Sequence, residues 1–261
     1  RDGSGAGISG AAAGGDLSSG SNGSSTPPNE TSDAGSIPSG TAIGLRSSVG
    51  AAGGVAVGYN NSAGNPDYNS TAIGTSNSAN GAYGVAIGYG NTADGRSTLS
   101  LGTGNQASGD IAIALGRQSY AVGDFSFAQG FIASAYGQDA LAIGRLSVAG
   151  EKGASSTASN IAIGDNTSAQ GGSALAIGSG AKASGKRAVA IGSNAMALRG
   201  TISGMEAYSG TALSSANTEF SVGDSGTERQ ITNVAGGQKD TDAVNVRQLR
   251  GLGNTLGTTL G

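Results

Sequence analysis

The 261-residue sequence contains no cysteine, no histidine and no tryptophan. Structural zinc sites are built mainly from cysteine and histidine, and thiol nucleophiles and Ser-His-Asp triads also need one of the two. Their absence excludes several enzyme classes, and we expect neither a metal nor any other cofactor. The chain has only 4 prolines and 4% aromatic residues but 50 glycines, a composition that does not suit an ordinary globular core.

The charges of the chain are few and nearly balanced, with 14 Lys and Arg residues against 17 Asp and Glu residues. No basic face is evident, so we expect no nucleic-acid partner. The chain lacks a run of about 18 apolar residues, and it begins at Arg1 without an apolar leader. We therefore expect it to be a piece of a longer protein.

A four-residue phrase of the type Leu-Ala-Ile-Gly returns along most of the chain. Eight of the ten intervals between its glycines are 14 residues, and the other two are 16 and 20. In most periods an alanine lies five residues and a glycine seven residues after this landmark glycine. The landmark glycines are Gly44, Gly58, Gly74, Gly88, Gly102, Gly116, Gly130, Gly144, Gly164, Gly178 and Gly192.

A period of 14 residues is too short for a helix and a strand, so it predicts a β-solenoid whose coil has two short strands and two tight turns. We assign residues 40–199 to this solenoid. Counting from each landmark glycine, positions −3 and −1 carry large apolar residues, whereas position −2 is alanine in ten of eleven coils. Ordinary apolar side chains need about 10 Å between stacked sheets, more than two tight turns allow. The alanines are therefore predicted to fill the interior, and the large residues to point outward.

The outward stripe of Val, Ile, Leu and Phe residues is too large an apolar patch for a soluble monomer. We expect it to be buried in a closed cyclic assembly of identical chains. The predicted interface residues are Val85, Ile87, Ile113, Leu115, Leu141, Ile143, Ile161, Ile163, Leu175, Ile177, Val189 and Ile191.

The two long intervals contain insertions that are predicted to protrude as loops, and loops on rigid scaffolds are frequent binding sites. The candidate binding residues are Asn65, Pro66, Asp67, Tyr68, Glu151 and Lys152. Residues 1–39 are rich in Gly and Ser without an apolar period, which predicts a flexible leader or an irregular cap on the first coil.

The period is lost after residue 199, and residues 200–219 are predicted to be an irregular connector. Asp240 or Thr241 is a plausible N-cap for a helix that starts near Ala243. Val246, Leu249, Leu256 and Leu260 occupy a and d positions of a heptad, with Gly253 at the intervening a position.

The repeats, followed by Arg229-Gln230-Ile231-Thr232-Asn233-Val234-Ala235 and Asp240-Thr241-Asp242-Ala243-Val244-Asn245-Val246-Arg247-Gln248-Leu249, resemble the YadA-type head and neck of trimeric autotransporter adhesins. The resemblance implies an all-β fold, a left-handed parallel β-roll that is homotrimeric, with a neck at 220–250 and a coiled-coil stalk beginning at 251–261. The neck residues that it implicates are Arg229, Gln230, Ile231, Asn233, Val234, Asp240, Asp242, Ala243, Val244, Asn245, Val246, Gln248 and Leu249.

The resemblance also implies a function: a non-catalytic adhesin on the bacterial surface, exposed beyond the outer membrane and held there by an anchor outside these residues. Its partners would be host extracellular-matrix or cell-surface molecules, or other bacterial cells. Collagen binding in the family is associated with an Asn-Ser-Val-Ala-Ile-Gly-x-x-Ser motif. The nearest match begins at Asn69 and has Thr71 and Asn77 at two of these places, so collagen is not identified as the ligand.

Two other functions stay open at this point. The solenoid can be a structural spacer that displays another binding domain, or an ice-binding protein, although its threonines do not form one ladder. An enzyme is not expected, because Asp94, Asp110, Asp124, Asp139 and Asp165 follow different turns without a paired pattern.

Overall fold

The computed structural model describes residues 40–50, 53–64, 68–153, 159–199, 203–214 and 218–260. The chain divides into two units, residues 1–224 and residues 225–261, and each is considered by itself. The leader at 1–39 lies outside the described residues, as do Asn65, Pro66 and Asp67 of the first predicted loop.

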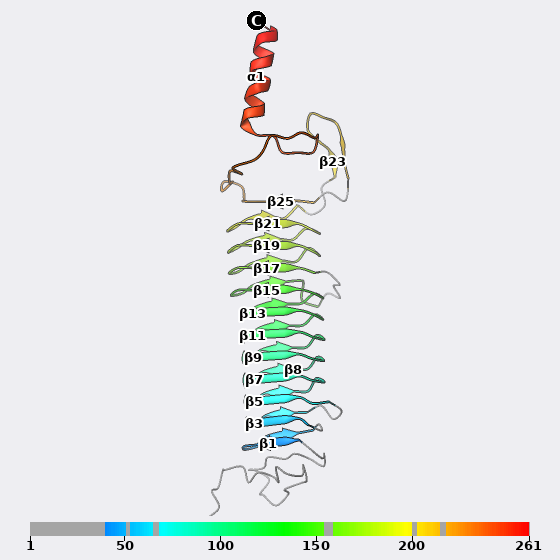
Figure 1. Ribbon diagram of the computed structural model, residues 1–261, viewed down its shortest axis with the longest axis vertical. Coiled ribbons are helices and arrows are strands. Elements are labelled where there is room, and N and C mark those ends of the chain that lie inside the picture. Colours follow the sequence, from blue (N-terminus) through cyan, green and yellow to red (C-terminus); the bar gives the residue numbers. More distant parts are fainter. Residues whose placement is uncertain are drawn as a thin grey trace, which may run out of the picture. The chain divides into compact units, whose positions relative to one another are not determined.

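The first unit is a parallel β-roll made of two facing sheets, as the 14-residue period predicts (Figure 1). One sheet has twelve strands: β1 (Thr41–Ile43), β3 (Val55–Tyr59), β5 (Thr71–Thr75), β7 (Val85–Tyr89), β9 (Leu99–Thr103), β11 (Ile113–Arg117), β13 (Phe127–Phe131), β15 (Leu141–Ile143), β17 (Ile161–Ile163), β19 (Leu175–Ile177), β21 (Val189–Ile191) and β25 (Phe220–Ser221). The other sheet has eleven: β2 (Ser48–Val49), β4 (Ser62–Ala63), β6 (Ser78–Ala79), β8 (Thr92–Ala93), β10 (Gln106–Ala107), β12 (Tyr120–Ala121), β14 (Ser134–Ala135), β16 (Val148–Ala149), β18 (Ser168–Ala169), β20 (Lys182–Ala183) and β22 (Met196–Ala197).

Every coil is in register with the next, so that equivalent positions of the repeat form columns along the roll. Ala114 of β11, for example, lies between Ser100 of β9 and Ala128 of β13. The extra residues of the 20-residue interval lie outside the strands, because Ile143 still pairs with Ile163 in register. The sequence period is therefore translated directly into columns of like side chains.

The interior of the roll is filled by alanine, as predicted. Ala56, Ala86 and Ala142 at position −2, and Ala79 and Ala107 on the facing sheet, are fully buried. The large side chains at −3 and −1 lie on the outer side of the first sheet. Because an alanine column buries little apolar area, the fold depends heavily on the hydrogen bonds between successive coils.

A ladder of buried asparagines runs inside one turn of the roll, and the sequence reasoning missed it. Asn61, Asn77, Asn91 and Asn105 lie three residues after consecutive landmark glycines and are almost completely buried. Asn91 Nδ2 donates to the carbonyl oxygens of Ile87 at 2.9 Å and Gly102 at 2.7 Å. Asn91 Oδ1 accepts the backbone N–H of Asn105 at 3.0 Å. Each asparagine thus fixes its own turn and the turn of the next coil.

We predict that Asn91→Ala lowers the free energy of unfolding by about 2–4 kcal/mol, because it leaves buried carbonyl and N–H groups without partners. Urea denaturation followed by circular dichroism measures this loss. The matched control is Asn80→Ala: Asn80 is exposed and donates to Asp94 Oδ1 at 2.9 Å on the surface. That control should change stability by no more than about 0.5 kcal/mol, and equal effects of the two substitutions would contradict a special role for the ladder.

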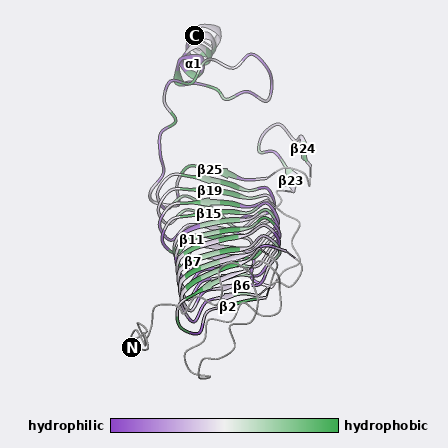
Figure 2. Cartoon of the chain, turned by 60° about the horizontal axis from the view of Figure 1, so that its bottom comes forward, coloured by the Kyte–Doolittle hydropathy of each residue, from purple (hydrophilic) through white to green (hydrophobic). Residues whose placement is uncertain are grey.

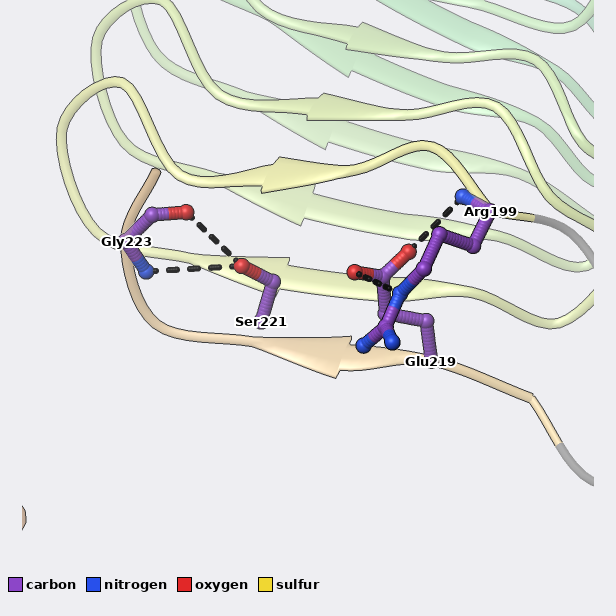
Figure 3. A network of polar contacts seen from close by, with 4 residues as sticks. All are labelled: Arg199, Glu219, Ser221 and Gly223. Atoms are coloured by element: carbon purple, nitrogen blue, oxygen red, sulfur yellow. Dashed lines mark hydrogen bonds and ion pairs between the residues drawn. The ribbon is translucent and has the colours of Figure 1, made fainter. Parts of the chain in front are cut away.

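The last strand of the first sheet comes from residues that the sequence assigned to the neck. After the short antiparallel hairpin of β23 (Gly204–Met205) and β24 (Ala212–Leu213), the chain returns and β25 pairs with β21. Arg199 and Glu219 hold this return: Glu219 Oε2 accepts the backbone N–H of Arg199 at 2.8 Å, and Oε1 accepts its Nε–H at 3.1 Å (Figure 3). Ser221 Oγ donates to the carbonyl of Gly223 at 2.8 Å. β25 therefore covers the edge that β21 would otherwise expose.

The second unit contains one helix, α1 (Val246–Leu260). Its N-cap is Asn245, not Asp240 or Thr241 as expected, because Asn245 and Gln248 form a reciprocal capping box. Gln248 N donates to Asn245 Oδ1 at 3.2 Å, and Asn245 N donates to Gln248 Oε1 at 3.3 Å. Among the described residues, no helix has the length and apolar character needed to cross a bilayer.

Candidate functional site

The outer face of the first sheet carries the apolar stripe that the sequence assigned to a subunit interface. Its predicted residues lie on β7, β11, β15, β17, β19 and β21, and they are half-buried by their neighbours in adjacent coils, while Ile191 is 38% exposed. Figure 2 shows hydrophobic colour along the strands of the stack and hydrophilic colour along the turns. The stripe is thus a continuous apolar column on the outside of the roll.

The outer face of the second sheet differs in character. The outward residue of each short strand is usually small or polar, as with Ser62, Ser78, Thr92, Gln106 and Ser168. The roll therefore has one apolar face and one polar face. A polar face of this kind stays in water at little cost, whereas the apolar face gains free energy when another surface covers it.

The residues of the two predicted binding loops that the structure describes are exposed. Tyr68 is 47% exposed, and its ring centroid lies 5.2 Å from that of Tyr83 in the next coil. Glu151 and Lys152 are exposed at the start of the second insertion, whose residues 154–158 lie outside the described part.

The turn carboxylates are engaged in contacts along the roll. Asp124 Oδ1 accepts the backbone N–H of Asp110 at 2.9 Å, and Asp110 Oδ1 accepts that of Arg96 at 3.1 Å. Asp165 pairs with Arg145 at 2.8 Å. In the part of the chain that the structure describes, no three acidic side chains gather as they would around a metal ion. These carboxylates stabilise turns of successive coils.

The predicted neck presents apolar side chains to solvent in a single chain. Ile231 is 67% and Val244 69% exposed, and Val246, Leu249 and Leu256 of α1 are all more than half exposed. Asn245 Nδ2 donates to the carbonyl of Val234 at 3.1 Å, and Gln248 Nε2 donates to that of Gly237 at 2.8 Å. The first bond connects the two sequence blocks of the neck, 229–235 and 240–249, and the second holds the segment between them against the second block.

A tight turn before α1 is held by one carboxylate. Asp242 Oδ2 accepts the backbone N–H of Gln238 at 3.0 Å and that of Lys239 at 3.1 Å. These two hydrogen bonds, the Gln238 bond first, hold the pKa of Asp242 below its ordinary value. The ionised carboxylate therefore stabilises the turn.

The stabilisation by Asp242 is predicted to depend on pH in one direction. Because its pKa is lowered in the folded turn, the contribution is complete above the ordinary aspartate pKa of about 3.9 and is lost as the pH falls through the lower folded value. NMR titration should show the amide protons of Gln238 and Lys239 moving with a midpoint below about 3.9. Asp242→Asn should abolish this titration, and a midpoint above the ordinary value would contradict the assignment.

Comparison with known families matches both parts of the chain. The family described as the YadA head domain repeat matches at residues 68–91, 93–119, 107–131, 121–147, 161–181 and 169–195. The family described as the coiled stalk of trimeric autotransporter adhesin matches at residues 230–261. Together they cover more than half of the chain.

Three known proteins are similar to this chain, each over a different share of its length. The autotransporter adhesin EhaG of Escherichia coli O157:H7 is 52% identical over 52 residues, which are 20% of this chain and 3% of EhaG. The collagen-binding domain of the Yersinia adhesin YadA aligns over 79% of this chain and 86% of that domain, with 24% identity and a TM-score of 0.40. The C-terminal YadA-like domain of BPSL2063 from Burkholderia pseudomallei aligns over 34% of this chain and 45% of that domain, with 39% identity and a TM-score of 0.26.

Proposed function

We propose that the chain forms the homotrimeric head of a bacterial surface adhesin. The reason is that it belongs to the trimeric autotransporter adhesins, with a YadA-like head and stalk. Residues 40–199 would be the head, 220–250 the neck and 251–261 the start of the stalk. The head would stand outside the outer membrane and act as a rigid rod that carries adhesive surfaces, without catalysis.

The observation that carries this proposal is the apolar stripe outside an interior of alanine. Burying a Val, Leu or Ile side chain fully contributes about 1.5–3 kcal/mol, and the stripe residues are only half-buried in one chain. Three chains side by side, each with its first sheet toward a common axis, bury the stripe and leave the polar second sheet outside. The exposed apolar residues of the neck and α1 support the same assembly.

The adhesive contacts belong on the parts that remain outside such a trimer. These are the polar outer face of the second sheet and the two insertions, with Asn65, Pro66, Asp67, Tyr68, Glu151 and Lys152 as candidate contacts. We propose a host extracellular-matrix or cell-surface molecule as the partner. Three copies per trimer, and many trimers per cell, multiply weak contacts into firm attachment.

Two measurements test the proposal. Light scattering after size exclusion should give the mass of three 24.8 kDa chains, and a folded, dispersed monomer would overturn the assembly. A panel of matrix proteins should then be tested against the intact chain and against deletions of residues 65–68 and 151–156. Loss of binding in one deletion assigns the contact to that loop, whereas binding that survives both assigns it to the coil faces. A chain that binds no member of the panel would favour the spacer function.

A further inference from the structure

The apolar face of the first sheet is bordered by two columns of exposed side chains. The trailing edge is the residue directly after each landmark glycine, just past the −1 position of the strand. The leading edge is the residue five before the landmark, in the turn that precedes the strand. Both edges are exposed in seven coils, in which the trailing-edge residues are Tyr89, Thr103, Arg117, Phe131, Arg145, Ser179 and Ser193, and the leading-edge residues are Tyr83, Ser97, Ile111, Phe125, Asp139, Ser173 and Arg187.

The two edges match in chemistry in five of these seven coils, whereas Ile111 lies opposite Arg117 and Arg187 lies opposite Ser193. Tyrosine stands at both edges of one coil, small hydroxyl residues at both edges of two coils, phenylalanine at both edges of another, and opposite charges at the next. These pairs, leading edge first, are Tyr83 with Tyr89, Ser97 with Thr103, Phe125 with Phe131, Asp139 with Arg145, and Ser173 with Ser179. In the coil with Ile111 opposite Arg117, the arginine stem offers apolar surface.

Among the residues that the structure describes, no contact within one chain accounts for this match. The two edges of a coil lie at opposite ends of a strand, and the five-residue strand β7 alone spans about 13 Å. The contacts of the edge residues within the chain run along the roll instead. The guanidinium carbon of Arg117 lies 5.3 Å from the ring centroid of Phe131, and Arg145 pairs with Asp165.

The leading edge also places bulky residues in an unfavourable backbone conformation. Tyr83, Ile111 and Phe125 have φ values of 58°, 57° and 57°, a left-handed region in which large and β-branched residues are disfavoured. All three are exposed, at 52%, 44% and 53%. Ser97 and Asp139 occupy the same turn position with small or polar side chains. The turn itself therefore does not require bulky apolar residues. Tyr83 packs against Tyr68 in the same chain, whereas the presence of Ile111 and Phe125 points to a contact outside the chain.

We infer that the leading edge of each chain contacts the trailing edge of a neighbouring copy at the same level of the roll. This rests on the trimer of the proposed function, because rotation about an axis parallel to the roll brings the opposite edges of neighbouring chains together without an axial shift. The partner that contacts these edges is a second copy of this chain, because both edges adjoin the stripe and because both members of each matched pair lie within this one sequence.

Such pairing fixes the axial register of the assembly. The stripe is nearly uniform, so sliding one chain by a coil exchanges one aliphatic contact for another. At the edges the same slide places Phe131 against Asp139, which separates the matched pairs and sets a carboxylate against an aromatic ring without its arginine partner. The edges thus supply the specificity that a repetitive stripe lacks.

Cysteine cross-linking in the full chain tests this inference without background, since the chain has no cysteine. Four substitutions are combined in two ways. The level pairs are Tyr83→Cys with Tyr89→Cys, and Phe125→Cys with Phe131→Cys. The crossed pairs are Tyr83→Cys with Phe131→Cys, and Phe125→Cys with Tyr89→Cys, which join positions three coils apart, about 14 Å along the roll. Each is treated with the shortest aliphatic bis-maleimide and examined on a denaturing gel.

Both level pairs should yield a covalent three-chain species at least tenfold more abundant than either crossed pair, and single substitutions should yield no three-chain species. A trimer by light scattering in which level pairs do not cross-link, or in which crossed pairs cross-link as well, overturns the edge pairing and leaves the trimer intact. A monomer by light scattering overturns the trimer and the edge pairing together.

Discussion

Replacing Ile163 by aspartate is expected to abolish the trimer. Ile163 lies in the middle of the stripe, in register between Ile143 and Ile177. In the proposed assembly the substitution removes apolar burial from each chain and brings three carboxylates toward one axis. Burial of an unpaired charge costs several kcal/mol per ion, so we expect a loss of more than about 4 kcal/mol per chain. Light scattering should show the mass of one chain, or aggregation of chains that cannot assemble.

The control for this prediction is Ser168→Asp, which introduces the same charge in the same coil on the polar second sheet. It should remain trimeric, with a change in melting temperature of no more than a few degrees. A trimer of unchanged stability in the Ile163→Asp variant would show that the stripe is not the surface that joins the chains.

Gly102→Ala is expected to prevent folding of the roll or to destabilise it by more than about 3 kcal/mol. Gly102 has φ of +127°, a conformation that residues with a Cβ rarely adopt. A Cβ added there would overlap the carbonyl oxygen of Gly116 in the next coil. Since the two glycines are paired in the β9 and β11 ladder, the clash falls on the hydrogen-bonded backbone, which cannot move away. Urea denaturation and expression in the soluble fraction measure the effect.

Gly104→Ala is the matched control, because Gly104 follows Gly102 by two residues in the same coil. Its φ is 63°, and the nearest atom to an added Cβ is Gln118 Cγ at 3.7 Å. Ser76 and Gln118 occupy the equivalent position with φ of 56° and 55°. The loss should therefore not exceed about 1–2 kcal/mol. Similar losses at Gly102 and Gly104 would mean that close approach of the coils is not what requires glycine.

The prediction of the roll from sequence succeeded because its determinants are local and repeated. Alternation of side chains along a strand and the narrow spacing set by tight turns act within each 14-residue period. They assign Ala142 to the inside and Ile143 to the outside without knowledge of any other coil. The signal for the asparagine ladder was also present, since Asn61, Asn77, Asn91 and Asn105 recur at the repeat interval. It was missed because asparagine in a turn is usually solvated.

The other features that sequence reasoning did not find depend on segments that interrupt the period. β25 is separated from β21 by a hairpin, so the repeat spacing does not predict that Glu219 contacts Arg199. The cap of α1 was placed too early because several polar residues precede the helix, and only the folded turn selects Asn245 through its bond with Gln248.

The sequence by itself determined the coil, its alanine interior and the outward direction of the large side chains, because these follow from sterics within one repeat. Only the tertiary structure decided which columns lie at the borders of the apolar face, which polar groups are buried, and what closes the end of the roll. Those properties arise when coils stack and the chain returns upon itself, because a side chain's burial and neighbours then depend on the coils before and after it.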